Sequence, residues 1–243
     1  MKLILPRRKL VLLAAPAIIG LAKPAPAAWP SSGQPYPINT APASQLVAHG
    51  QAGINQGAFT AIDTTGANAL YMAISAGSAP TPSDSKSNTW ALSVSDTGVA
   101  PQTYLYECLT PTVGTGHTFA TTGSNWGFCV AAFKGLAPSP IGPTNHNHTS
   151  ALTSAGIQPG SVTPSTSKTL FISAWGYATA SSSATPDSGY SVTDYRVYIP
   201  ANCYAVALAY LVQAGLTPSN PTWTTNVVGG IAATALIAAF KST

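Results

Sequence analysis

The chain approximately repeats itself after about 100 residues, and this repeat limits the possible folds more than any other feature. Asn68-Ala69-Leu70-Tyr71 is echoed by Lys168-Thr169-Leu170-Phe171 at an offset of 100. Val130–Lys134 is echoed by Ile237–Lys241 at an offset of 107. The offset grows along the chain, as it would if the loops of the two copies differed in length.

A third echo relates Pro82-Ser83-Asp84-Ser85 to Thr185-Pro186-Asp187-Ser188, about 103 positions later. We therefore predict two pseudo-symmetric halves of one sandwich, with pseudo-repeats at 57–135 and 167–242. Residues 136–166 are rich in Pro, Gly, Ser and Thr and are predicted to be an exposed connector. Two tandem small domains are the alternative.

Short apolar runs separated by turn residues predict β-strands throughout both halves. Two runs, 203–214 and 229–240, are long enough for helices, but their β-branched and aromatic residues favour strands. The expected fold is an all-β, jelly-roll-like antiparallel β-sandwich. The expected strands are 46–52, 57–62, 69–76, 89–95, 102–109, 117–122, 127–134, 169–176, 190–198, 203–212, 221–227 and 231–241.

The composition is typical of β-sandwiches found outside the cytoplasm. Of the 243 residues, 45% are hydrophobic and only 7% are charged, against a usual charged share of about a quarter. From Ala28 onward, five Lys and Arg residues stand against six Asp and Glu residues, a net charge of −1. Without a basic patch the folded part has no means of releasing counterions from a phosphate backbone, so we expect no nucleic-acid partner.

Residues 1–28 are expected to form a signal-like or anchoring segment. A basic start precedes an apolar stretch and a small-residue site, which together predict export and cleavage before Ala28. The paired arginines make the segment similar to a twin-arginine signal. A Pro-, Ser- and Gly-rich linker at 29–44 and the β-sandwich domain at 45–243 are predicted to follow. The residues expected to direct anchoring or export are Arg7, Arg8, Ala25 and Ala27.

The three cysteines stand singly in apolar or aromatic runs and have no zinc-ligand or CxxC spacing. We expect buried free thiols that pack as small hydrophobic side chains. A disulfide between Cys108 and Cys129, which lie on strands that could be neighbours, is the alternative, and it would leave Cys203 over.

Several short motifs resemble a recurrent bacterial and phage β-sandwich domain, which reads N-x-L, D-S-x-G-N-T-W, Y-Y, G-x-H-T and A-x-F-x-G in order and ends on A-x-F-K. The matching stretches here are Asn68–Leu70, Asp84–Trp90, Tyr104–Tyr106, Gly116–Phe119, Val130–Gly135 and Ala238–Lys241. Ser87 occupies the position where the family usually has Gly. The resemblance covers most of residues 57–241. It implies a jelly-roll-like sandwich of the kind found in phage virion proteins and secreted surface proteins, generally without catalysis.

No catalytic constellation is recognisable, so an enzyme is not expected. A G-x-S-x-G elbow is missing from the sequence. Glu107 is the sole glutamate, whereas glycoside cleavage usually needs two carboxylates across the bond. Asp63, Asp84, Asp187 and Asp194 stand next to turn residues, where we expect them to cap turns through side-chain to backbone hydrogen bonds.

One histidine cluster, Asn145-His146-Asn147-His148, could serve a metal. In an extended segment His146 and His148 point to the same side, as two ligands of one ion would. Because no nearby Cys, Asp or Glu in the sequence completes a site, we expect an exposed polar loop and no cofactor. A metal site at His146 and His148 is the alternative. The oxygen-rich loop 84–88 is expected to form an Asx-type turn and not a calcium site.

The weak candidates for ligand binding are Tyr190, Tyr195 and Tyr198. They lie beside a Gly- and Ser-rich loop and are expected to form an exposed patch, and aromatic platforms of this kind bind sugar rings. The four tryptophans beyond the linker are expected in the core.

Together these features predict a non-catalytic structural or adhesive surface protein. We expect a phage virion component of the head-decoration or head-fibre type, located on the virion surface. Its expected partners are other virion or cell-surface proteins, glycans, and further copies of itself in a homo-oligomer. The alternative is a bacterial protein secreted or exported to the periplasm through the twin-arginine-like signal, which binds carbohydrate through the sandwich surface.

Overall fold

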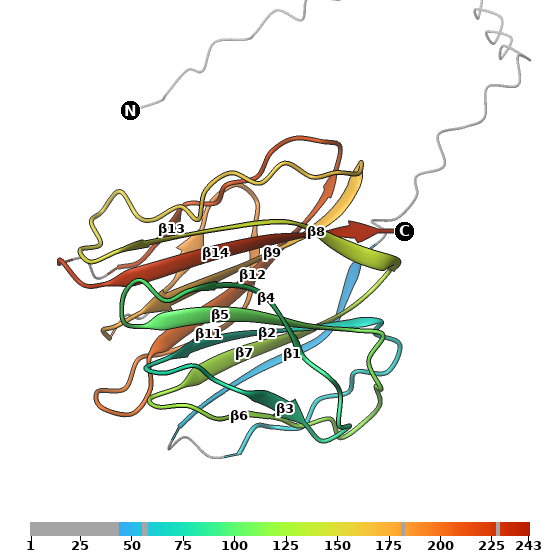
Figure 1. The fold of residues 1–243 in the computed structure, drawn as a ribbon, viewed down its shortest axis with the longest axis horizontal. Helices are drawn as coiled ribbons and strands as arrows, with labels where there is room; N and C mark the ends of the chain where they lie inside the picture. Colours follow the sequence, from blue (N-terminus) through green and yellow to red (C-terminus); the bar gives the residue numbers. More distant parts are fainter. Residues whose placement is uncertain (1–43, 55–57, 181–182, 227–228) are drawn as a thin grey trace, which may run out of the picture. The chain divides into compact units, whose positions relative to one another are not determined.

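Two large antiparallel sheets, each built from one half of the chain, form the centre of the protein (Figure 1). The computed structural model describes residues 44–54, 58–180, 183–226 and 229–243, and within these it contains strands but no helix. In spatial order, the first sheet consists of β1 (Gln45–Gly53), β7 (Gly127–Lys134), β2 (Ala69–Ala76), β5 (Gln102–Leu109) and β4 (Ala91–Asp96). The second consists of β8 (Leu136–Thr149), β14 (Ala233–Ser242), β9 (Lys168–Tyr177), β12 (Ala205–Ala214) and β11 (Ser191–Arg196).

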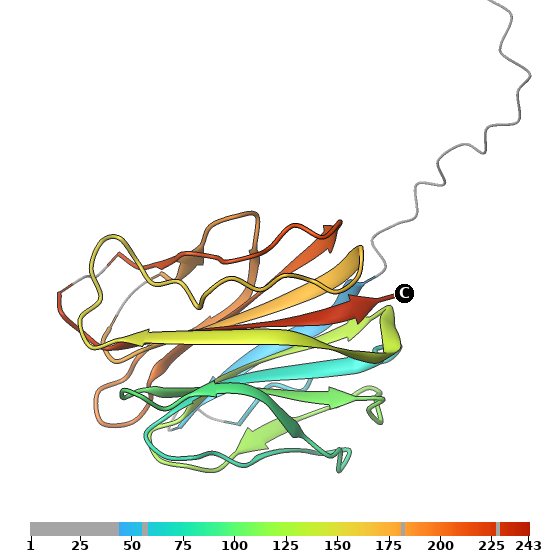
Figure 2. The same ribbon diagram turned by 45° about the horizontal axis from the view of Figure 1, so that its top comes forward.

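Two small sheets lie on the outer faces of the large ones, so the protein has four layers (Figures 1 and 2). One pairs β3 (Pro82–Asp84) with β6 (Phe119–Thr121), and the other pairs β10 (Thr185–Pro186) with β13 (Trp223–Thr224). Counted from its own first strand, each half therefore uses its seven strands in the same way.

Three apolar layers separate the four sheets. Between the large sheets, Tyr71 and Phe133 pack against Ile172 and Phe240. A second layer lies between the first sheet and the β3–β6 side of the molecule, and a third lies under β13, where Trp223 stacks on Trp175 at a centroid distance of 6.3 Å. Because both faces of each large sheet are covered, all eight residues of β2 are buried.

The predicted fold class is confirmed: the protein is an all-β, jelly-roll-like antiparallel sandwich with two pseudo-repeated halves. The apolar run 203–214 contains strand β12 and the run 229–240 contains most of strand β14, as their composition predicted. Each half is nevertheless one strand longer than the sequence echo suggested. The predicted connector begins with the 14-residue strand β8, the counterpart of β1, and its later part buries Leu152 and Val162.

The sequence echo is also out of register by one residue in the central strand. Ala69 pairs with Phe133, and Leu170 pairs with Phe240, so Ala69 corresponds to Leu170 at an offset of 101 and not 100. A shift of one residue moves every side chain to the opposite face of a sheet. The apparent match of Leu70 to Leu170 therefore joins an outward-facing residue to an inward-facing one.

The predicted signal-like segment 1–28 lies outside the described residues, together with Arg7, Arg8, Ala25 and Ala27 and with linker residues 29–43. Among the described residues, no helix is long and apolar enough to cross a membrane.

The two buried tyrosines Tyr71 and Tyr190 should respond in opposite ways to removal of their hydroxyl groups. Within the described residues the Tyr71 hydroxyl has no hydrogen-bond partner, whereas the Tyr190 hydroxyl lies 2.8 Å from Ser219 Oγ. A buried polar group without a partner costs about 1–3 kcal/mol. We expect Tyr71→Phe to raise the free energy of unfolding by about 1 kcal/mol and Tyr190→Phe to lower it by about 1 kcal/mol. Urea unfolding at pH 7 tests this, and equal losses in both variants would contradict it.

Candidate functional site

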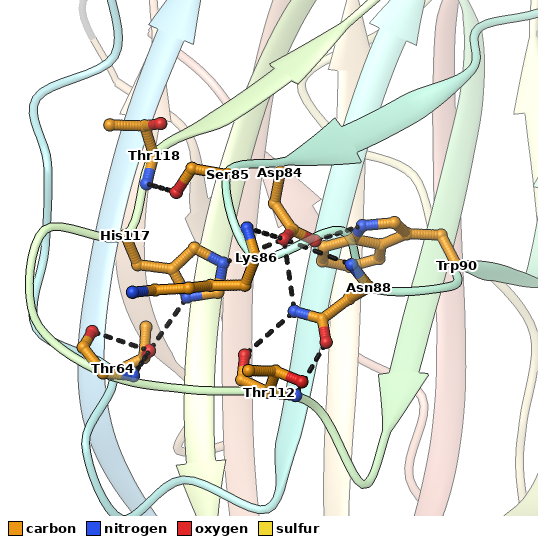
Figure 3. Close-up of polar contacts among 10 residues, drawn as sticks. Thr64, Asp84, Ser85, Lys86, Asn88, Trp90, Thr112, His117 and Thr118 are labelled. Atoms are coloured by element: carbon orange, nitrogen blue, oxygen red, sulfur yellow. Dashed lines mark hydrogen bonds and ion pairs between the residues drawn. The ribbon is translucent and has the colours of Figure 1, made fainter.

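A polar network centred on Asp84, at the end of β3, joins three loops of the first half (Figure 3). The carboxylate Oδ1 accepts hydrogen bonds from the Lys86 backbone N–H at 2.8 Å and from Asn88 Nδ2 at 3.2 Å. Its Oδ2 accepts one from Trp90 Nε1 at 2.9 Å. The Asx-type turn predicted for this loop is therefore present, and the same carboxylate fixes the Trp90 ring against the outer apolar layer.

His117 connects Asp84 to Thr64 beneath this loop. Its Nε2 lies 3.2 Å from Asp84 Oδ1, close enough for an ion pair but outside hydrogen-bond alignment. Its Nδ1 lies 2.9 Å from Thr64 Oγ1. Thr64 Oγ1 also accepts a hydrogen bond from the Gly114 backbone N–H at 3.1 Å, so this hydroxyl is held by two neighbours.

Thr64, His117 and Asp84 follow the order hydroxyl, imidazole and carboxylate of a nucleophilic triad. A triad nucleophile must be accessible to its substrate, however, and these three groups are buried. The Asp84 and His117 side chains are 0% exposed, and so is Thr64. Burial acts to raise the pKa of Asp84, yet the hydrogen bonds from Lys86, Trp90 and Asn88 and the nearby His117 outweigh it and hold the pKa below its usual value. The network therefore keeps an ionised carboxylate inside the protein, closed to solvent, where it braces loops.

The rest of the loop is held by reciprocal hydrogen bonds. Asn88 Nδ2 donates to the Thr112 carbonyl at 3.0 Å, and the Thr112 N–H donates to Asn88 Oδ1 at 2.7 Å. Ser87 has φ = 59°, in the left-handed region that favours glycine. This is the position where the resembled pattern carries Gly, and here serine adopts that conformation.

Among the described residues of the second half, the Asp84 network has no copy. Asp187, which the sequence echo placed opposite Asp84, instead takes the place of Ser85. Its Oδ1 accepts from the Thr222 N–H at 2.7 Å, just as Ser85 Oγ accepts from the Thr118 N–H at 3.0 Å. The echo was again one residue out of register. Asp187 is a side-chain to backbone cap, as predicted, but the N–H that it caps belongs to Thr222, the residue just before β13.

Histidine–carboxylate pairs close both edges of the sandwich, where an edge strand of one large sheet faces an edge strand of the other. At the β4–β8 edge, Asp96 Oδ2 lies 2.9 Å from His146 Nδ1, and Asp96 Oδ1 lies 3.0 Å from His148 Nδ1. At the β1–β11 edge, Asp194 Oδ2 lies 2.9 Å from His49 Nδ1. The prediction that Asp194 caps a turn is therefore wrong. Asp194 lies within β11, and its carboxylate reaches across to the other large sheet.

Asp96 is the functional candidate that the sequence did not reveal. It is 50 residues before His146, so the clustering comes from the packing of β4 on β8 and not from a local motif. The local signal at Asp96 was Asp-Thr-Gly, and the Gly98 N–H indeed donates to Asp96 Oδ1 at 3.0 Å. His146 and His148 point to the same side of their strand, as predicted, but they belong to β8 and not to a loop.

The predicted exposed patch of tyrosines does not form as a whole, because only Tyr195 and Tyr198 are partly exposed. Tyr190 is buried, and Tyr195 packs beside Trp175 at a centroid distance of 6.2 Å. Tyr198 lines a hollow of about 110 Å³, where its ring lies beside that of Tyr204, a residue that was not predicted as a candidate. Asn125 and Asn202 complete the polar lining of this hollow.

The cysteines are buried free thiols, as predicted. The alternative disulfide between Cys108 and Cys129 is wrong. Strand β2 lies between their strands, and Cys108 faces the outer apolar layer whereas Cys129 faces the layer between the large sheets.

Over the part of the chain that the structure describes, no group of three or more His, Cys, Asp or Glu side chains is arranged to hold a metal ion. No family model matches the chain, and no curated protein or solved structure matches it either.

Replacing Asp84 with asparagine should destabilise the protein in a pH-dependent way. A hydrogen bond to a charged group contributes about 1.5–3 kcal/mol, and the Asp84 carboxylate accepts bonds from Lys86, Asn88 and Trp90. We therefore expect Asp84→Asn to lower the free energy of unfolding by about 3 kcal/mol at pH 7. Because the pKa of folded Asp84 lies below its unfolded value of about 3.9, its stabilising effect is complete above that value and is lost as the pH falls through the folded pKa.

The measurement is urea unfolding of both proteins between pH 7 and pH 2.5, where the difference between them should shrink. Asp63→Asn, which alters an exposed turn cap on the Thr65 N–H, is the matched control and should change stability much less. A difference between Asp84→Asn and wild type that stays constant down to pH 2.5 would contradict the assigned role.

Proposed function

We propose that the chain is a non-catalytic structural or adhesive surface protein, specifically a phage virion component of the head-decoration or head-fibre type. The proposal draws on the resemblance to the phage and bacterial sandwich domain and on the low charge of the folded part. The observation that carries it is that every carboxylate in the described residues has an internal partner. The pairs are Asp63 with Thr65, Asp84 with His117, Asp96 with His146 and His148, Glu107 with Ser93, Asp187 with Thr222, and Asp194 with His49.

A catalytic carboxylate must contact its substrate, whereas these carboxylates bind turn residues or link neighbouring strands and sheets. Glu107, the one glutamate, accepts a hydrogen bond from Ser93 Oγ at 2.6 Å and is only 4% exposed. Burial raises the pKa of Glu107. Its cross-strand neighbour is Tyr71, which is buried between the large sheets, so Glu107 also faces the interior of the sandwich. This use of acidic residues supports a rigid scaffold whose outer surface is hydroxyl- and amide-rich.

The long edge strand β8 fits a module that must stay soluble at high local concentration. Pro138, Pro140 and Pro143 remove three N–H donors from its first eight residues. Prolines on an edge strand hinder pairing with a further strand. The proposed assembly with other virion proteins or further copies would then use side chains and loops and not β-augmentation along this part of the edge.

Density-purified particles provide the direct test. We expect the protein to co-purify with them at a fixed stoichiometry and to show the intact mass of the full-length chain. A soluble species that starts at Ala28 and is missing from particles would contradict the virion assignment and would support the exported alternative.

Carbohydrate binding is the second candidate, and the hollow beside Tyr198 favours it. Two half-buried tyrosine rings with a centroid distance of 6.2 Å flank the amides of Asn125 and Asn202, which combines apolar faces with hydrogen-bonding groups. On a glycan array, Tyr198→Ala should lose at least tenfold in apparent affinity for any glycan that the wild type binds, because a ring face is removed. Tyr190→Phe, altered away from this hollow, should bind as wild type. Glycan binding that is unchanged in Tyr198→Ala would exclude this hollow.

A further inference from the structure

The β4–β8 edge contains a pair of histidines whose orientation is set by one buried carboxylate. His146 and His148 are two residues apart on β8, and both direct Nδ1 at Asp96. The Asp96 side chain is 1% exposed, whereas the two imidazole rings are 53% and 44% exposed. The carboxylate is therefore inside, and the rings reach from it to solvent.

The carboxylate also fixes which ring nitrogen is free. Asp96 Oδ2 lies 2.9 Å from His146 Nδ1, and Asp96 Oδ1 lies 3.0 Å from His148 Nδ1 and accepts a hydrogen bond from the Gly98 N–H at 3.0 Å. With the carboxylate as the acceptor of these contacts, each Nδ1 carries the proton. In the neutral imidazole this leaves the lone pair on Nε2, and neither Nε2 has a partner among the described residues.

The glycine at position 98 leaves room for the His148 ring in this orientation. A Cβ added at Gly98 would lie 2.2 Å from His148 Cε1, so the ring rests directly on this glycine and any larger residue would displace it. On a strand, side chains two residues apart lie on one face with a separation of about 6.6 Å. Two imidazoles at that separation can converge on one ion at about 2.0–2.1 Å from each nitrogen.

We propose that Nε2 of His146 and Nε2 of His148 together bind one divalent transition-metal ion of the Cu²⁺, Ni²⁺ and Zn²⁺ class. Imidazole nitrogens suit these ions, and a carboxylate that accepts the other ring N–H is the usual outer partner of a metal-binding histidine. Asp96 is thus a positioning residue and not a ligand. With two protein ligands, the remaining coordination positions are open to water or to a donor from a partner. The site is independent of the proposed virion role.

The opposite edge provides a matched control within the same molecule. His49 also directs Nδ1 at a carboxylate, Asp194, and is 45% exposed. It stands alone on β1, because the residues two positions away on either side are Val47 and Gln51. A single imidazole offers one donor, so His49 should contribute little to binding.

Isothermal titration of the untagged full-length chain with CuCl₂, NiCl₂ and ZnCl₂ tests the site. We expect one ion per chain, with Cu²⁺ bound most tightly. His146→Ala and His148→Ala should each weaken binding by at least tenfold, and Asp96→Asn should weaken it by about tenfold to 100-fold. His49→Ala should bind as wild type.

Failure to take up Cu²⁺ saturably would overturn the proposal, and so would equal affinity in wild type and the His146 and His148 variants. Folding is checked separately with His146→Gln and His148→Gln, which keep a polar side chain and should retain the wild-type circular dichroism while losing the metal. Nitrogen-15 NMR of the metal-free protein should show the Nδ1–H tautomer in both rings. An Nε2–H tautomer in either ring would also overturn the proposal.

Discussion

The structure depends on covering both faces of two large antiparallel sheets. Such sheets commonly leave one face to solvent, but here β2, β9 and β14 are buried along nearly their whole length. Each large sheet therefore needs two apolar neighbours: the other large sheet on one face, and on the other face its own small sheet with the adjoining loops. Four layers and three apolar cores follow from this requirement. The near-continuous apolar runs in the sequence have the same cause.

These runs explain how much could be read from the sequence. Strands β2, β5 and β7 were predicted at their observed bounds, and β9 and β14 within a residue or two, because runs bounded by turn residues carry a local signal. Strand β8 was missed because its prolines and polar residues look like a connector, and only its pairing with β14 makes it a strand. The predicted register between the two repeats was wrong by one residue, because a strand that is buried on both sides carries similar apolar residues on both faces.

The candidate sites likewise divide into those with a local sequence signal and those that depend on long-range packing. The turn at Asp84 was predictable, since Asp, Ser and Asn within five residues describe an Asx turn. The clustering of Asp96 with His146 and of Asp194 with His49 was not, because it depends on which edge strands face each other across the sandwich. Tyr190 looked exposed from its Gly- and Ser-rich neighbours, yet its ring is buried in the outer apolar layer of the second half, in the same cluster as Ala184 and Trp223.

The two halves share a topology but anchor their small sheets by different chemistry. In the first half, Trp90 Nε1 donates to the ionised Asp84. In the second, Trp223 Nε1 donates at 2.9 Å to Ser173 Oγ, which itself donates to the Leu236 carbonyl at 2.8 Å. A hydrogen bond from an indole to a carboxylate weakens when acid protonates that carboxylate, whereas one to a hydroxyl does not. The outer layer of the first half should therefore loosen before that of the second as the pH falls. Because the faces of the large sheets are covered, chemistry that meets solvent must lie at the sheet edges and loop ends, where the exposed histidines are found.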